Sequence, residues 1–306
     1  MKPIIIVIFI ISALIASARD IVSFGIDTRN NLPTVEVYVN NDTVPFNFIF
    51  DTGCSVVMAN ANNDRLMKLL NLCDMDTAEY AHSSAIIRKT AFDNTLMLGS
   101  LHVDSIQIFA DNDPSTEYDG IIGQQLLERF SKVGIFPDSK IIIFCEKGEP
   151  LKIIDGIVQP LIKSGGVYGT DLTIKTDSCS VNGLYMIDTG FTGTICVNSD
   201  FSENNNFPKT LKQFGGESSS DGAGIRNNSI MVTAPRIKFA GESMPLLPII
   251  LEENSYPTEW RQTFNGLIGY DLLKRFRMIW DYENMTITLA PGFNYFSPIT
   301  SIKQQQ

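Results

Sequence analysis

Two short stretches of the sequence place an aspartate where a buried charge would be costly. Residues 47–58 read NFIFDTGCSVVM and residues 185–196 read YMIDTGFTGTIC, so Asp51 and Asp188 each follow apolar, strand-like residues and stand two positions before a glycine. An ionised carboxylate is unstable among apolar side chains unless hydrogen bonds or a partner group offset its desolvation. Two copies of one unfavourable arrangement indicate a shared chemical role.

Two carboxylates that share a pocket can act as a paired acid and base. Both cannot ionise cheaply at short range, so one proton is held between them and their apparent pKa values separate. The ionised carboxylate can take a proton from a water molecule while the protonated one donates to a developing oxyanion. We therefore predict Asp51 and Asp188 as the catalytic residues of a hydrolase that needs neither a metal nor a cofactor.

A single Asp-Thr-Gly tripeptide is weak evidence, since these residues often form a tight turn in which the aspartate accepts hydrogen bonds from backbone amides. Here the tripeptide occurs twice, each time after an apolar segment and each time followed, two residues beyond the glycine, by a hydroxyl residue. The paired arrangement predicts supporting roles for further residues, with a simple turn function as the alternative. These residues are Thr52, Gly53, Ser55, Thr189, Gly190 and Thr192.

A second repeated block organises the chain around these stretches. DGIIGQQLLERF at residues 119–130 matches NGLIGYDLLKRF at residues 265–276 without a gap, and each block follows its own Asp-Thr-Gly. Between the tripeptide and the block, each half also carries a strand–glycine–strand pattern, at residues 95–109 and 236–250. An internal repeat of this kind predicts two homologous lobes.

Alternating apolar residues predict a hairpin before each acidic stretch. In the second half we expect the hairpin turn at Asn182-Gly183, a dipeptide that favours tight turns. The apolar spacing after Gly123 and Gly269 predicts one or two helical turns. Residues 215–224, GGESSSDGAG, are too polar and glycine-rich for a core, and we expect a mobile or disordered loop there.

The predicted fold is all-β and bilobal, with two homologous strand-rich lobes and few short helices. We divide the chain into a signal peptide, an N-terminal lobe, a linker where glycine, proline and charge interrupt the apolar pattern, a C-terminal lobe and a flexible tail. Their bounds are 1–18, 19–150, 151–156, 157–296 and 297–306.

At these residues the sequence resembles the aspartic peptidases of the pepsin and retropepsin clan, over nearly all of the mature chain. The resemblance rests on FDTGCS with DGIIG and on IDTGFTG with NGLIG. It implies a bilobal aspartic-peptidase-like fold in which the apolar-apolar-glycine segment of each block packs beside the catalytic loop. It also implies that Ser55 and Thr192 orient the outer carboxylate oxygens.

The resemblance implies how the two acidic loops support each other. Thr52 and Thr189 would each hydrogen-bond across to the opposite loop and lock the two turns together. Gly53 and Gly190 would let the backbone approach the carboxylates, so that amide groups can solvate the charge.

The segment that covers the substrate departs from the family's pattern. Pepsin-like enzymes carry a tyrosine in a glycine-flanked hairpin of the first lobe, and no such string follows Asp51. Residues 78–90 offer Tyr80 at a suitable distance, with an ordinary loop as the alternative, and residues 215–224 could play the equivalent part in the second lobe. The short lobes and DTGFTG make the chain look closer to retropepsin-like enzymes than to pepsin.

Composition disfavours several other functions. Acidic side chains outnumber basic ones 34 to 24 in the 306-residue chain, and no run of Lys or Arg could follow a phosphate backbone, so we expect no nucleic-acid partner. No Gly-x-Ser-x-Gly or His-Glu-x-x-His motif is present. The five cysteines match no zinc pattern; buried apolar packing, with or without one or two disulfide bridges, would account for them.

The N-terminus has the pattern of an export signal. Lys2 precedes an apolar run at residues 3–16, and small residues precede Arg19. The alternative is a signal anchor, but the run is shorter than the roughly 20 residues that a spanning helix needs. We expect cleavage, a secreted or lumenal/periplasmic protein and no membrane contact afterwards.

These observations predict a secreted aspartic endopeptidase that hydrolyses peptide bonds of polypeptide substrates with a water activated between Asp51 and Asp188. The alternative is a catalytically silent, peptide-binding relative with the same fold. Both tripeptides are intact, which favours the enzyme. Because one chain carries both acidic loops, we expect a monomer.

Overall fold

The computed structural model describes most of the chain after the predicted leader, which lies outside the described residues. The described ranges are 19–73, 76–79, 84–87, 89–111, 118–220, 226–256 and 258–299. Within them strands predominate, and no helix is longer than six residues. The predicted all-β class with few short helices is confirmed.

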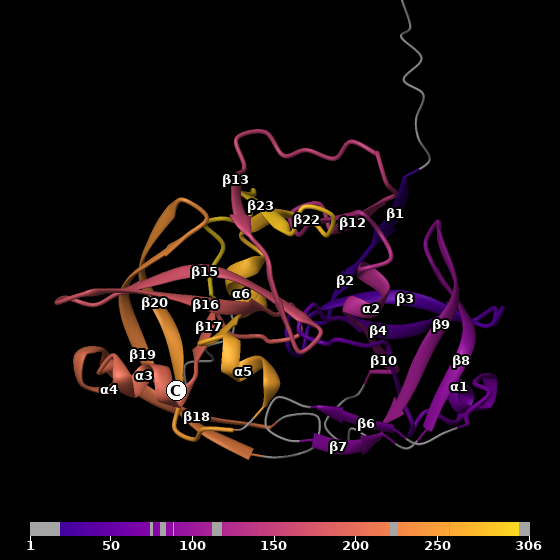
Figure 1. The fold of residues 1–306 in the computed structure, drawn as a ribbon, viewed down its shortest axis with the longest axis horizontal. Helices are drawn as coiled ribbons and strands as arrows, with labels where there is room; N and C mark the ends of the chain where they lie inside the picture. Colours follow the sequence, from indigo (N-terminus) through magenta and orange to yellow (C-terminus); the bar gives the residue numbers. More distant parts are fainter. Residues whose placement is uncertain are drawn as a thin grey trace, which may run out of the picture.

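The N-terminal lobe is built on a seven-stranded sheet with the order β2-β3-β4-β10-β5-β9-β8 (Figure 1). Two short helices and a separate hairpin, β6–β7, complete the lobe. The strands are β2 (Gly25–Ile26), β3 (Pro33–Val39), β4 (Phe46–Phe50), β5 (Met58–Asn60), β6 (Asp76–Glu79), β7 (Ser84–Ile87), β8 (Lys89–Leu98), β9 (Leu101–Asp111) and β10 (Gly120–Ile122), and the helices are α1 (Asp64–Leu69) and α2 (Gln124–Leu127).

The C-terminal lobe is built on an eight-stranded sheet with the order β14-β15-β16-β21-β17-β20-β19-β18. Four short helices accompany this sheet. The strands are β14 (Ile162–Ser164), β15 (Val167–Lys175), β16 (Ser180–Ile187), β17 (Ile195–Val197), β18 (Lys212–Ser220), β19 (Arg226–Phe239), β20 (Glu242–Glu252) and β21 (Gly266–Ile268), and the helices are α3 (Ser199–Asn204), α4 (Phe207–Thr210), α5 (Glu259–Thr263) and α6 (Tyr270–Leu273).

The two lobes repeat one arrangement of strands. In the first lobe β4 pairs in parallel with β10, and β5 pairs in parallel with β9. In the second lobe β16 and β21 form the corresponding parallel pair, as do β17 and β20. Each repeated block contains one short helix, α2 or α6, which begins directly after the block's second glycine. The bilobal architecture predicted from the internal repeat is therefore confirmed.

A third, six-stranded sheet joins the two halves of the chain, with the order β1-β12-β11-β22-β23-β13. Three strands come from each half, and β11 pairs with β22 at the centre, where Val133 lies opposite Trp280. Both of these side chains are buried in the core. The strands are β1 (Asp20–Ser23), β11 (Lys132–Phe136), β12 (Ile141–Cys145), β13 (Ile157–Pro160), β22 (Phe276–Asp281) and β23 (Thr286–Pro291).

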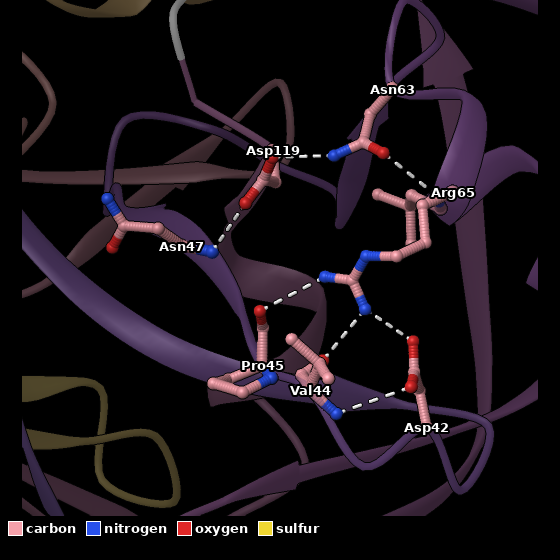
Figure 2. A network of polar contacts seen from close by, with 8 residues as sticks. Asp42, Val44, Pro45, Asn47, Asn63, Arg65 and Asp119 are labelled. Carbon is pink, nitrogen blue, oxygen red and sulfur yellow. Dashed lines mark hydrogen bonds and ion pairs between the residues drawn. The ribbon is translucent and has the colours of Figure 1, made fainter.

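The first residue of each repeated block fastens the strand that leads to an acidic loop. Asp119 accepts hydrogen bonds from the Asn47 backbone N–H at 2.7 Å and from the Asn63 side chain at 2.6 Å (Figure 2). In the second lobe the Asn265 side chain accepts a hydrogen bond from the Leu184 backbone N–H at 3.0 Å. Asn47 lies in β4 and Leu184 in β16, so the same position of the repeat holds the same strand in both lobes.

Arg65 of α1 holds the turn that connects β3 to β4. Its guanidinium donates to the carbonyl oxygens of Val44 at 3.0 Å and Pro45 at 3.1 Å, and it pairs with the Asp42 carboxylate (Figure 2). The same group lies 3.5 Å from the centre of the Phe46 ring. Arg65 of α1 thus fixes the start of β4, the strand that ends at the acidic loop of this lobe.

We expect Arg65→Ala to lower the free energy of unfolding by about 1–2 kcal/mol, because carbonyl acceptors lose a charged donor and a ring loses its cation. Urea unfolding measures the change. Lys68→Ala is the matched control, since Lys68 is exposed on the same helix and makes no ion pair within the described residues. The control should stay within about 0.5 kcal/mol of wild type. Equal losses in both variants would remove the role given to Arg65.

The predicted turn at Asn182-Gly183 is wrong. Both residues lie inside β16, paired with β15, and the turn runs from Thr176 to Cys179. The Thr176 hydroxyl accepts a hydrogen bond from the Cys179 backbone N–H at 3.1 Å, and the Thr176 N–H donates to the Cys179 carbonyl at 2.9 Å. A threonine whose side chain closes the turn therefore prevails over the Asn-Gly preference.

The predicted mobile or disordered loop at residues 215–224 is wrong over residues 215–220. These residues belong to β18 and pair along β19, with Gly216 opposite Ile230. Strand pairing uses backbone groups, so an edge strand can form from serines and glycines when its neighbour is long. Residues 221–225 lie outside the described part of the chain.

Two further expectations fall partly outside the described residues. The segment proposed to cover the substrate, residues 78–90, overlaps the antiparallel pair of β6 and β7, and Tyr80 lies outside the described residues. At the other end, the predicted tail begins against the core. Arg275 donates to the Ser297 carbonyl, and Ile299 packs against buried side chains.

None of the five cysteines forms a disulfide bond. Cys145 and Cys196 are buried, whereas Cys73 and Cys179 are exposed. The packing alternative therefore holds for the buried two, and no disulfide contributes to the fold. No helix in the described ranges is long and apolar enough to cross a membrane.

Candidate active site

Each aspartate stands directly after a central strand and is held by the repeated block of its own lobe. The Asp51 N–H donates to the Ile122 carbonyl at 2.9 Å, and the Asp188 N–H donates to the Ile268 carbonyl at 2.9 Å. The preceding strands, β4 and β16, place apolar side chains in the core, so the backbone enters each loop from a rigid support.

The glycine of each block packs against the acidic loop, as the resemblance implied. A Cβ atom at Gly123 would lie 2.3 Å from the Val56 carbonyl oxygen, and one at Gly269 would lie 2.2 Å from the Gly193 carbonyl oxygen. No side chain fits at either position. The close contact between each glycine and a carbonyl oxygen of the loop therefore fixes the position of each acidic loop relative to its repeated block.

Two buried threonines connect the loops of the two lobes. The Thr52 N–H donates to the Thr189 hydroxyl at 3.0 Å, and the Thr189 N–H donates to the Thr52 hydroxyl at 3.1 Å. The Thr52 hydroxyl donates to the Ile187 carbonyl at 2.8 Å, and the Thr189 hydroxyl donates to the Phe50 carbonyl at 2.7 Å. Each hydroxyl therefore accepts one bond and donates another across the lobe boundary, and neither is left unpaired in the interior.

The two carboxylates lie against each other's loops. The Gly53 N–H donates to Asp51 Oδ1 at 2.7 Å, and the Gly190 N–H donates to Asp188 Oδ1 at 2.8 Å. A Cβ atom at Gly53 would lie 2.5 Å from Asp188 Cγ, and one at Gly190 would lie 2.3 Å from Asp51 Cγ. The structure thus brings together both predicted aspartates and both predicted glycines in one half-buried site.

The two carboxylates differ in how strongly their surroundings favour the protonated form. Burial raises the pKa of both. The pKa of Asp188 rises well above its usual value, because the charge of Asp51 and a hydrogen bond between the two carboxyls add to the effect of burial. For Asp51, hydrogen bonds from Gly53 and from Asp188 oppose burial. Burial and the repulsion between the two charges therefore favour a state in which the pair shares one proton.

We expect Asp188→Asn to gain stability relative to wild type as the pH rises. A carboxyl whose pKa is raised by folding stabilises the folded state fully below its unfolded pKa, and this contribution is lost as the pH rises through the folded pKa. Asparagine does not titrate, so the variant escapes that loss. Urea unfolding at about pH 3, 5 and 7 measures the difference in free energy of unfolding between the variant and wild type. A difference that stays constant across this range would contradict the raised pKa of Asp188.

The roles predicted for Ser55 and Thr192 stay predictions. Among the described residues, neither hydroxyl forms a hydrogen bond to the carboxylate of Asp51 or Asp188. The Ser55 side chain instead faces the turn between β14 and β15, where a Cβ atom at Gly166 would lie 2.8 Å from the Ser55 Cβ.

One residue of this site, Gln124, was not identified from the sequence. Its side chain is fully buried, its Nε2 donates to the Thr52 carbonyl at 2.8 Å, and its Oε1 accepts a hydrogen bond from the Tyr282 hydroxyl at 2.9 Å. The sequence carried one signal, a difference between the two repeated blocks. After its second glycine, the first block has Gln124 and the second block has Tyr270. A helix start was the only role that periodicity could assign.

Cys54 stands beside Gly53, in surroundings that disfavour a reactive thiol. The half-buried Sγ lies 3.4 Å from the Val56 carbonyl oxygen and 3.9 Å from Met58 Sδ. Burial, together with the charges of the two aspartates, raises the pKa of the thiol. The thiolate needed for redox or nucleophilic chemistry is therefore disfavoured.

Comparison with solved structures places this arrangement in a known architecture. The crystal structure of an aspartic proteinase from Irpex lacteus is similar, with a TM-score of 0.60 over 92% of this chain and 100% of that chain. The chain has the fold of an aspartic proteinase. The sequence identity is 14%, so this likeness concerns the fold alone.

The sequence itself gives no comparable match. No protein-family model and no curated protein matches it. In the described ranges, no group of three or more His, Cys, Asp or Glu side chains is placed to hold a metal ion. The chemistry of the site must therefore be argued from its own residues.

Proposed function

We propose that the protein is an aspartic endopeptidase. One observation carries the proposal: two Asp-Thr-Gly loops, one from each lobe, are joined by reciprocal threonine hydrogen bonds, with each glycine against the opposite carboxylate. This geometry holds two carboxylates in one site, where burial raises the pKa of both and favours one shared proton. Such a pair supplies an acid and a base at one place.

In the proposed reaction, Asp51 takes a proton from a water molecule that lies between the carboxylates. The water oxygen attacks the carbonyl carbon of a peptide bond, while Asp188 donates its proton to the carbonyl oxygen. The tetrahedral intermediate then collapses as the pair protonates the leaving amine. The buried threonines keep the two loops at a fixed separation throughout, because neither hydroxyl can move without leaving a partner unpaired.

The test is cleavage of a denatured protein and of a peptide library by the purified chain, at several pH values, with and without pepstatin. We expect internal cleavage that pepstatin blocks, with a bell-shaped pH profile whose maximum lies on the acid side of neutrality. Binding of peptides without cleavage at any pH would instead favour the alternative function, a catalytically silent peptide-binding protein with this fold.

We also expect the active species to be a monomer, because one chain supplies both acidic loops and all four threonine hydrogen bonds between them. Specific activity should then be independent of dilution. Activity that falls steeply on dilution, together with a dimer in sedimentation experiments, would show that a second chain is needed.

Two finer points belong to the same proposal. The apolar run at residues 3–16 supports export to a secreted or lumenal/periplasmic location. The closer likeness to retropepsin-like enzymes stays a prediction that rests on DTGFTG and on the short lobes. Subsite mapping with the peptide library would compare the two groups directly.

A further inference from the structure

The two acidic loops are near copies, yet they differ in the residue that follows the second glycine of the neighbouring repeated block. At the position after the block's second glycine, the first lobe has Gln124 and the second has Tyr270. Gln124 is fully buried and uses both ends of its amide. Among the described residues, no side chain donates a hydrogen bond to the Thr189 carbonyl, the counterpart of Thr52.

The hydrogen bonds of Gln124 form part of a continuous chain. The Tyr282 hydroxyl donates to Gln124 Oε1 at 2.9 Å, and Gln124 Nε2 donates to the Thr52 carbonyl oxygen at 2.8 Å. That carbonyl belongs to the same peptide unit as the Gly53 N–H, which donates to Asp51 Oδ1 at 2.7 Å. All donors therefore point the same way, from Tyr282 toward Asp51.

A chain with this direction strengthens its last bond. A donor at a carbonyl oxygen draws electron density from the peptide unit and makes the N–H of that unit a better donor, and hydrogen bonds in series polarise one another in this way. The Gly53 N–H is one of the groups that lower the pKa of Asp51 against the effect of burial. Anything that polarises this N–H therefore favours the ionised form of Asp51.

The first donor in the chain keeps its proton at every pH at which the site would work. Burial raises the pKa of Tyr282, and the neighbouring Tyr168 and Glu128 raise it further. Lys163 pairs with Glu128 at 2.7 Å, so the charge near Tyr282 is partly neutralised. Within the described ranges, the titratable groups beside Asp51 are Asp188 and the Cys54 thiol, and burial keeps the thiol protonated.

We propose that Tyr282 and Gln124 are positioning residues that select Asp51 as the ionised member of the pair, by polarising the Thr52–Gly53 peptide through a chain of hydrogen bonds that begins at Tyr282 in the opposite half of the protein. This inference rests on the proposed function only for its consequence in catalysis. The fold itself then determines which carboxyl is ionised, before any substrate binds.

The first experiment measures kcat/KM against pH for wild type, Tyr282→Phe, Gln124→Met and the double variant. Each single change should move the acid limb of the profile upward by roughly half a pH unit, because Asp51 loses support for its charge. The double variant should move no further than Gln124→Met, since both residues act through one chain. Tyr270→Phe is the matched control on the other loop and should leave the acid limb in place.

The second experiment does not depend on activity. In an Asp188→Asn background, only Asp51 of the pair titrates, and carboxyl ¹³C NMR follows it. Adding Gln124→Met should raise the pKa of Asp51, whereas adding Tyr270→Phe should not. A pKa of Asp51 that Gln124→Met leaves unchanged would overturn the inference, whatever the activity. A raised pKa of Asp51, combined with a wild-type protein that cleaves nothing, would support the inference and count against the proposed function.

Discussion

Asp51→Asn and Asp188→Asn each lower kcat/KM by at least about 1,000-fold if the two carboxylates form one catalytic pair, since each substitution removes the general acid or the general base. Asparagine has nearly the shape of aspartate, and it can still accept the bond from Gly53 or Gly190 that holds the loop. The fold should therefore remain. Peptide cleavage at the optimal pH measures the loss, and circular dichroism checks the fold.

The matched control is Asp104→Asn, because Asp104 is an exposed aspartate on β9 whose side chain contacts Thr95 and lies 3.7 Å from His102. This variant should keep near wild-type activity. Near-normal turnover in either dyad variant would show that the two carboxylates do not work as a unit.

The second large effect is expected from a single methyl group between the lobes. A Cβ atom at Gly190 would lie 2.3 Å from Asp51 Cγ, and one at Gly53 would lie 2.5 Å from Asp188 Cγ. Neither contact can exist, so Gly190→Ala or Gly53→Ala must push the carboxylates apart. Catalytic groups need their geometry held to about 0.5 Å, and displacement of this size costs about 100-fold in rate or more.

Gly216→Ala is the control for the added methyl group. Its Cβ would have the Ser229 carbonyl oxygen as its nearest neighbour, at 3.6 Å, which is an ordinary contact. This variant should keep its activity. If Gly190→Ala also kept full activity, the close approach of the two loops seen here would have to be relaxed in solution.

The sequence predicted the parts of the fold that repeat. Two Asp-Thr-Gly tripeptides and two matching blocks were enough to locate Asp51 and Asp188, because a repeat compares the chain with itself and needs no tertiary information. The threonine contacts came from the family resemblance, since nothing local in the sequence says that Thr52 meets Thr189. Long-range contacts of this kind become visible only once both lobes are folded.

The failures share a physical cause, which is competition between local preference and its surroundings. The Asn182-Gly183 pair has a strong turn preference. The chain turns earlier in the sequence, however, where the Thr176 hydroxyl accepts a hydrogen bond from the Cys179 backbone, so the pair lies inside β16. The serines and glycines of β18 have little strand preference, but β19 is long enough to pair with them through backbone hydrogen bonds. Gln124 was missed because its two partners, in Thr52 and Tyr282, are far away in the chain.

The central sheet has a consequence for the integrity of the molecule. The chain passes between its halves through the segment between β12 and β13, where Ile154 is 86% exposed, while β11 and β22 hold the halves together by backbone pairing. Covalent continuity is therefore not what keeps Asp51 beside Asp188. A cut near Ile154 would leave two fragments, each of which supplies three strands to the six-stranded sheet. The two halves of the chain therefore pair with each other as the subunits of a heterodimer would. We therefore expect Asp51 and Asp188 to stay together after a cut in the segment between β12 and β13.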